Sequence, residues 1–326
     1  MKPCAGFIQR YTAGVSASLR LSLVAVARIC LLSSVLAASA QTLADSSDQN
    51  LPKEDAYRDG LKHFNAGRYS SAVGPLEKFL GEAKLEDSQR LMAEKALGFS
   101  QYFLGQYKSA VPHLERAANL DASDSEILYT LGVSLLNLRD AARARGAFGR
   151  VFHVDADSAA CGLLVARLMM RERMEDLAQV ELERIIRLEP ELPELHFLLG
   201  ELALFRGDVD RAVTNLTKEI QINPGYSMSY YRLGDAFSRK GSWRDAEAAL
   251  QQAIWLNPDF SSPYILMGKV FEQQGKLAAA EGMLGKALSM DPNNASAHYL
   301  MGTILKKLNR PTEAAKQFEI YRSLKR

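Results

Sequence analysis

Apolar residues between Ser229 and Phe260 recur at the three- and four-residue spacing of amphipathic helices. Gly241 separates two such runs, and Pro258 follows the second run. Glycine accepts turn conformations, whereas proline cannot continue a helix. The pattern therefore predicts two helices joined by a short turn, with small residues where the helices approach each other. The two runs consist of Tyr230, Leu233 and Phe237, and then Ala246, Leu250, Ala253 and Ile254.

The same pattern recurs along most of the chain with a period of 34 residues. We number each unit so that Gly234 and the residues equivalent to it in the other units are position 8. Position 8 is Gly60, Gly98, Gly132, Ala166, Gly200, Gly234, Gly268 and Gly302. Position 20 is alanine in all eight units, and position 24 is leucine or phenylalanine. The predicted units are 53–86, 91–124, 125–158, 159–192, 193–226, 227–260, 261–294 and 295–326. The first two glycines are 38 residues apart, so we expect four additional residues in a loop near Asp87–Arg90.

This unit resembles the tetratricopeptide repeat (TPR) family, whose repeats are 34-residue helix–turn–helix motifs. The resemblance covers about Lys53 to Arg326. It implies an all-α fold, a right-handed α-solenoid superhelix of about eight repeats. The fourth unit matches least well, because Ala166 and Arg173 replace the two glycines, but its period is intact.

The resemblance also implies that the first helices line a concave groove with positions 2, 5, 9 and 12. Position 5 is rich in aromatic residues, which make large contact areas with bound peptides. Charges change sign along this expected groove, from acidic in the middle to basic near the C-terminus. A packing role for the aromatic residues and an ordinary solvated face for the charges are the alternatives. The candidate partner-binding residues are Tyr129, Phe197, Glu201, Tyr231, Asp235, Lys269, Tyr299 and Lys306.

The N-terminal segment has the composition of a targeting sequence. No acidic residue precedes Asp45, and an apolar run at 29–37 is followed by Ala38-Ser39-Ala40. A basic region, an apolar run and a small-x-small site are typical of a cleaved export signal. We therefore predict a signal peptide at 1–40, a flexible leader at 41–52 and a periplasmic or secreted protein. An uncleaved membrane anchor and a mitochondrial transit peptide are the alternatives.

Composition excludes several classes of function. The formal net charge falls from +2 to −2 when the four basic residues of segment 1–40 are removed, which argues against nucleic-acid binding. Only Cys161 remains after that segment, so no internal disulfide is expected. The five histidines are scattered, with His196 and His298 at an apolar register position, so no metal site is predicted. No catalytic motif or phosphate-binding loop is present.

The sequence therefore predicts a non-catalytic scaffold or adaptor that binds a protein or an extended peptide, without a metal or cofactor. Membrane contact is expected only if the N-terminal segment is retained. Two alternatives stay open at this point: a regulatory or assembly subunit of an envelope enzyme or secretion complex, and a membrane-anchored TPR receptor.

Overall fold

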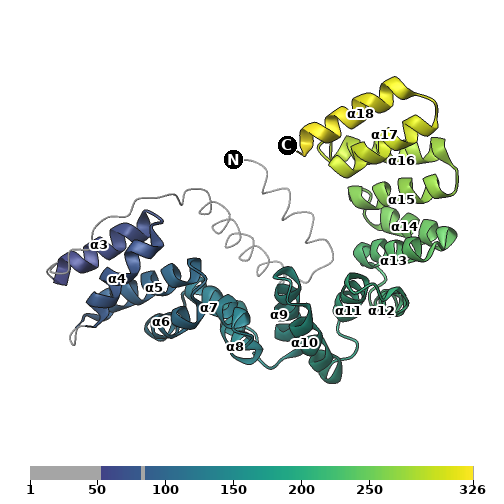
Figure 1. Ribbon diagram of the computed structural model, residues 1–326. Coiled ribbons are helices and arrows are strands. Elements are labelled where there is room, and N and C mark those ends of the chain that lie inside the picture. The colour runs from purple at the N-terminus through teal and green to yellow at the C-terminus, as the bar shows by residue number, and fades with distance from the viewer. Residues whose placement is uncertain (1–52, 82–84, 326) are drawn as a thin grey trace. The chain divides into compact units, whose positions relative to one another are not determined.

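The computed structural model describes residues 53–81 and 85–325 and shows only helices there (Figure 1). The predicted signal peptide and leader lie outside the described residues. The first eight helices are α3 (Lys53–Asn65), α4 (Tyr69–Leu80), α5 (Asp87–Phe103), α6 (Tyr107–Leu120), α7 (Ser125–Asn137), α8 (Ala141–Phe152), α9 (Ala159–Arg171) and α10 (Glu175–Leu188). The other eight are α11 (Leu195–Phe205), α12 (Val209–Ile222), α13 (Ser227–Lys240), α14 (Trp243–Leu256), α15 (Ser261–Gln273), α16 (Leu277–Met290), α17 (Ala295–Lys307) and α18 (Pro311–Leu324). The predicted all-α fold of about eight helix pairs is confirmed.

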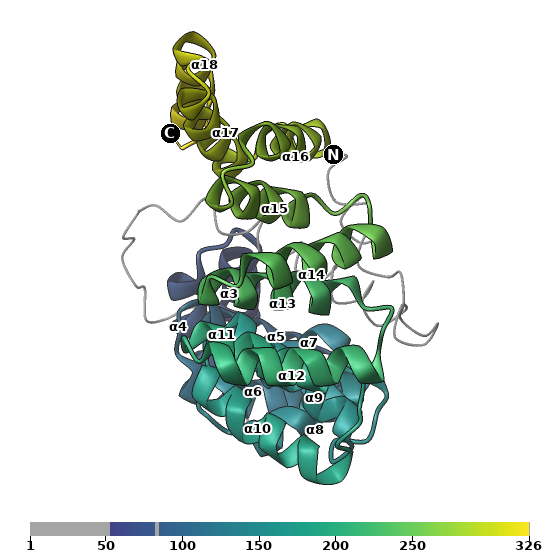
Figure 2. The same cartoon turned by 90° about the vertical axis from the view of Figure 1, so that its right-hand side faces the viewer.

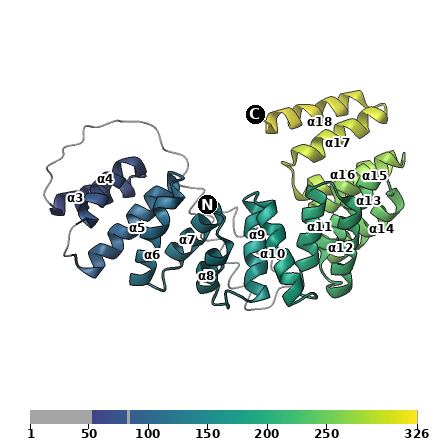
Figure 3. The same cartoon turned by 60° about the horizontal axis from the view of Figure 1, so that its bottom comes forward.

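The chain divides into two compact units between Glu181 and Leu182, inside α10. In the N-terminal unit, α3 packs on α4, α5 on α6 and α7 on α8, so each repeat consists of a first helix and a second helix (Figure 3). The second helix of each of these repeats also packs on the first helix of the next repeat. In the C-terminal unit, α11 to α18 form four such pairs (Figure 2). The first helices α11, α13, α15 and α17 also contact one another in succession. Each of the two compact units therefore has its own row of neighbouring first helices.

The two helices of a repeat meet at position 8. A Cβ atom at Gly234 would lie 2.7 Å from Cγ of Leu250, which is the residue at position 24 of the same repeat. Real Cβ atoms do not approach other atoms so closely, so only glycine fits without a shift of the leucine. The same close approach joins glycine to leucine or phenylalanine in the pairs Gly60–Leu76, Gly98–Leu114, Gly132–Phe148, Gly200–Leu216, Gly268–Leu284 and Gly302–Phe318.

The turn between paired helices has one backbone geometry throughout. Position 15 has a positive φ in every repeat, and five of the eight residues there are glycine. The other three are Arg139, Arg173 and Asn309, with φ values of 63°, 58° and 58°. The left-handed conformation costs a residue with a side chain about 1–2 kcal/mol. The repeats that lack the turn glycine therefore keep the standard turn at an energetic cost.

The expectation of a loop near Asp87–Arg90 is wrong. These four residues form the first turn of α5, which is 17 residues long. The repeat thus accommodates its four additional residues by lengthening a helix by about one turn, because a turn takes 3.6 residues.

Two glycine-to-alanine substitutions are expected to change stability in opposite directions. Gly234→Ala forces a methyl group against Leu250 and should lower the free energy of unfolding by about 1–2 kcal/mol. Gly282→Ala is the matched control, since Gly282 lies inside α16 with no atom within 4 Å of an added Cβ. There alanine should raise stability by about 0.5–1 kcal/mol through its higher helix propensity. Urea denaturation followed by circular dichroism measures both, and equal shifts in one direction contradict the close-packing account.

Candidate functional site

The aromatic residues at position 5 are mostly used inside the fold. Tyr129 is 8% exposed, and its ring centroid lies 5.6 Å from that of Phe148. Arg171 also donates a hydrogen bond to the Tyr129 hydroxyl at 2.8 Å. Phe197 is 5% exposed and packs edge-on against Tyr226 at 5.1 Å. Neither ring presents a surface large enough to anchor a partner.

The same position becomes more accessible along the C-terminal unit. Tyr231 is half-buried, with its ring 5.2 Å from Phe260, and burial raises the pKa of its hydroxyl. Tyr299 on α17 is 49% exposed, although one edge packs against Phe318 and Tyr321. Of the four predicted aromatic contacts, Tyr299 therefore offers the largest accessible ring.

The predicted acidic residues are held by neighbouring arginines. Glu201 on α11 accepts from Arg232 on α13 at 2.7 Å, and Asp235 accepts from Arg239 at 2.8 Å. Arg239 also donates to the carbonyl oxygen of Leu204 at 3.0 Å, which ties α13 to the end of α11. Glu201 and Arg239 therefore join neighbouring first helices, and the charge of both carboxylates is already balanced.

The two predicted lysines are different. Lys269 on α15 and Lys306 on α17 are exposed, and neither has a salt bridge within residues 53–81 and 85–325. On α17, Tyr299 and Lys306 are seven residues apart and so lie on one side of the helix. We call the exposed side of α13, α15 and α17 that carries Tyr231, Lys269, Tyr299 and Lys306 the C-terminal first-helix face. Whether these residues bind a partner stays a prediction.

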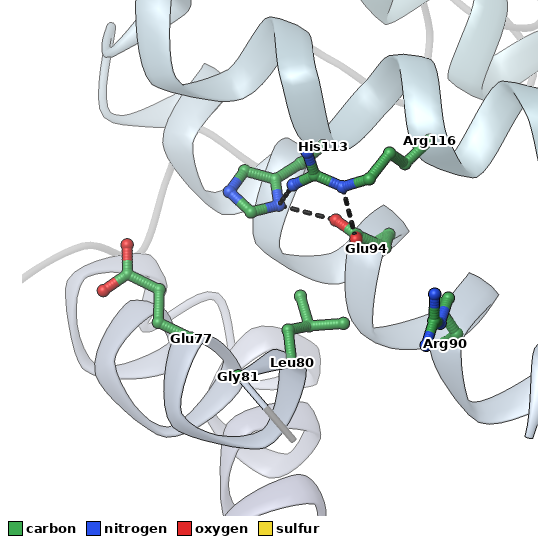
Figure 4. Close-up of a pocket in the computed structure, with 7 residues that line it drawn as sticks. All are labelled: Glu77, Leu80, Gly81, Arg90, Glu94, His113 and Arg116. Carbon is green, nitrogen blue, oxygen red and sulfur yellow. Dashed lines mark hydrogen bonds and ion pairs between the residues drawn. The ribbon is translucent and has the colours of Figure 1, made fainter. Parts of the chain in front are cut away.

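A polar pocket of about 360 Å³ lies between α4, α5 and α6 in the N-terminal unit (Figure 4). Its centre is the carboxylate of Glu94, whose side chain is 5% exposed. Nδ1 of His113 and Nε of Arg116 each lie 2.6 Å from an oxygen of this carboxylate. Burial alone would raise the pKa of Glu94, but the bonds to His113 and Arg116 outweigh burial and lower it. Glu94 is therefore held as a carboxylate.

Two further charges line the pocket, Arg90 from the added turn of α5 and Glu77 from α4. The pocket thus presents carboxylates and cations together and has no strong preference for either sign of ligand. The sequence prediction missed this cluster. The signals for it were the 38-residue spacing and an acidic residue at position 4, where the last four repeats have histidine or tyrosine.

Position 4 has a structural role in those later repeats. Nε2 of His196 donates to the carbonyl oxygen of Pro190 at 2.9 Å, and Nε2 of His298 donates to that of Pro292 at 2.9 Å. The Tyr264 hydroxyl donates to the carbonyl oxygen of Pro258 at 3.0 Å. Each bond ties a first helix to the proline that ends the preceding repeat. Both histidines are buried, as expected for packed imidazoles.

The described part of the chain holds no group of three or more histidine, cysteine, aspartate or glutamate side chains placed to bind a metal. Within the same residues, every helix is too short or too polar to cross a bilayer.

Three segments match family models described as tetratricopeptide repeat, at residues 95–158, 229–264 and 272–322. In these segments the chain is similar to tetratricopeptide repeats. The matched segments fall in both compact units, and the repeat geometry described above extends through the helices between them.

Among curated proteins, the chain is similar to anaphase-promoting complex subunit 3 of Schizosaccharomyces pombe. The two are 26% identical over 106 residues, which is 32% of this chain and 16% of that protein. The chain thus spans less than a fifth of the length of this relative.

Among solved structures, it is similar to MamA from Desulfovibrio magneticus RS-1, with 23% identity, a TM-score of 0.47 and coverage of 51% of this chain and 94% of MamA. It is also similar to the Cut9–Hcn1 hetero-tetramer of the anaphase-promoting complex, with 16% identity, a TM-score of 0.48 and coverage of 79% and 49%. A third is YrrB, described as a TPR protein with an unusual peptide-binding site, with 17% identity, a TM-score of 0.45 and coverage of 55% and 93%.

The buried carboxylate of Glu94 predicts a pH-dependent contribution to stability. Because its pKa is lower in the folded chain than in the unfolded chain, the contribution is present above the unfolded pKa and is lost as pH falls through the folded pKa. Glu94→Gln should therefore lower the free energy of unfolding at pH 7 by about 1–3 kcal/mol, with a smaller loss under acidic conditions. Denaturation of the wild-type protein and of the Glu94→Gln variant at several pH values measures the difference in the free energy of unfolding. An exposed carboxylate, Glu319→Gln on α18, is the control, and a loss at Glu94 that does not change with pH contradicts the prediction.

Proposed function

We propose that this TPR protein is a non-catalytic interaction module that binds a protein partner along the C-terminal first-helix face. The observation that carries the proposal is the exposure of Tyr299, at 49%, on the first helix α17, which is otherwise well packed. Exposed aromatic rings on a rigid surface are typical anchors of protein interfaces. The buried ring of Phe197 contributes by packing α11 against Tyr226, the residue before α13.

The architecture supports an extended partner. The four first helices of the C-terminal unit lie side by side, so a segment crossing them meets one position of each repeat in turn. Burial and hydrogen bonds keep these helices rigid, which reduces the entropy lost when a partner binds. The match to TPR models and the printed description of YrrB as a peptide-binding TPR protein are consistent with this mode.

We also propose that the chain acts after export to the periplasm or outside the cell, as an adaptor or assembly factor. The support is the sequence of the first 40 residues, with basic residues, an apolar run and Ala38-Ser39-Ala40.

Substituting the exposed tyrosine tests the interaction face. Tyr299→Ala should weaken capture of the partner from the native cell's envelope fraction by about tenfold or more, as expected for an interface anchor. Trp255→Ala is the matched control, because Trp255 is 74% exposed on α14, a second helix. Cross-linking with purified full chain as bait measures both, with helicity checked by circular dichroism. Loss of the partner with Trp255→Ala but not with Tyr299→Ala places the interface on the second helices and contradicts the proposal.

The export signal is tested by sequencing the N-terminus of the protein isolated from its native cell. We expect a mature chain that begins at Gln41, because Ala38 and Ala40 are the small residues that signal peptidase requires. Ala38→Asp should block cleavage and leave the longer chain. An intact Met1 in the wild-type protein contradicts cleavage and favours a retained anchor.

A further inference from the structure

Charge is unevenly divided between the two sides of the last three repeats. The first helices α13, α15 and α17 carry six basic side chains and two carboxylates. The second helices α14, α16 and α18 carry four basic side chains and five carboxylates. The six basic residues are Arg232, Arg239, Lys240, Lys269, Lys306 and Lys307. The first-helix side of these repeats is therefore distinctly positive, and the opposite side is close to neutral.

The carboxylates on the positive side are already paired. Asp235 bonds Arg239, and Glu272 bonds Lys307 at 2.8 Å. Arg232 is held by Glu201 of the preceding repeat. Lys240 reaches Asp210 at 2.7 Å, so its charge is also partly balanced. The unbalanced charge of this surface is therefore concentrated on the two exposed lysines, Lys269 and Lys306.

The two lysines sit on neighbouring helices with the exposed tyrosine. Lys269 is at position 9 of α15, and Lys306 and Tyr299 are at positions 12 and 5 of α17. The bond between Glu201 at position 9 and Arg232 at position 6 shows that position 9 faces the following first helix. Lys269 occupies the same position on α15, whose following first helix is α17. The exposed ring of Tyr299, the ammonium group of Lys306 on its own helix and that of Lys269 on the adjacent helix therefore belong to the same face of these two first helices.

We infer that the partner of this TPR protein presents an extended acidic segment to the C-terminal first-helix face, with carboxylates on Lys269 and Lys306 and an apolar side chain on Tyr299. This inference rests on the proposed function and names the chemistry of its partner. A positive surface whose own acids are paired attracts negative charge, speeds association and disfavours basic partners. The two lysines lie on neighbouring first helices, so an extended segment that crosses both helices can reach both ammonium groups.

The inference is tested with three short synthetic peptides of one pattern, in which the same positions are glutamate, glutamine or lysine and an identical tyrosine and leucine provide the apolar part. Fluorescence anisotropy with the purified full chain measures binding at low and at physiological salt. The glutamate peptide should bind at least about tenfold more tightly than the glutamine peptide at low salt, with a smaller ratio at physiological salt. The lysine peptide should bind weakest.

Charge-reversal variants locate the site. The double variant Lys269→Glu and Lys306→Glu should remove the preference for the glutamate peptide. The matched control is Lys218→Glu and Lys286→Glu, which makes the same change in net charge on exposed residues of the second helices α12 and α16. The control should keep the preference, and circular dichroism should show that all variants are folded.

Each other outcome overturns the inference. Equal losses in both double variants mean that the acidic peptide responds to net charge alone. A glutamine peptide that binds as tightly as the glutamate peptide, with binding lost in Tyr299→Ala, leaves the proposed function standing but removes the acidic partner. Self-association of the chain that Lys269→Glu and Lys306→Glu abolish, without peptide binding, identifies a second copy as the occupant.

Discussion

In seven of the eight repeats, the close contact between glycine at position 8 and a large side chain at position 24 is the constraint on which the packing of the paired helices depends. Without a Cβ atom at Gly234, Leu250 can lie directly against the backbone of the first helix. This contact fixes the separation of paired helices, and the left-handed residue at position 15 fixes the turn between them. Because both recur with the repeat, successive first helices come to lie beside one another. The proposed binding surface thus depends on contacts inside the repeats.

Two repeats that keep this contact also bury a carboxylate on or next to their first helix. Glu94 takes the place of the residues that bond a preceding proline, and His113 and Arg116 stabilise its charge. In the fifth repeat, α11 begins after Glu194, and Glu219 accepts backbone N–H groups of Glu194 and Phe197 at 2.8 and 3.3 Å. Burial of Glu219, which is fully enclosed, raises its pKa, whereas bonds to cationic partners lower that of Glu94. The charge of Glu94 is thus balanced by basic side chains, whereas Glu219 accepts hydrogen bonds from backbone N–H groups.

Periodicity predicted the helix pairs well, because glycine, alanine and proline at fixed positions record backbone requirements that are local to each repeat. The surface at position 5 could not be predicted in the same way. Whether its ring is buried depends on residues from other parts of the repeat, such as Phe148 on the second helix or Tyr226 before the next first helix. The lengthened α5 was also missed, since four additional residues fit either a loop or one more helical turn. The position of a residue in the repeat therefore predicts its backbone conformation, whereas the exposed fraction of its side chain depends on the side chains packed around it.

The same distinction explains how binding and stability are separated on one helix. On α17, Met301 and Ile304 are buried in the core, whereas Tyr299 and Lys306 lie on the side away from it. Aromatic residues at the equivalent position of earlier repeats are committed to packing, so changes there would cost stability before they changed recognition. Exposed lysines carry no such commitment, because isolated surface charges contribute little to folding. In the proposed interaction, charge on α15 and α17 therefore sets partner preference while the glycine contacts keep the repeat geometry unchanged.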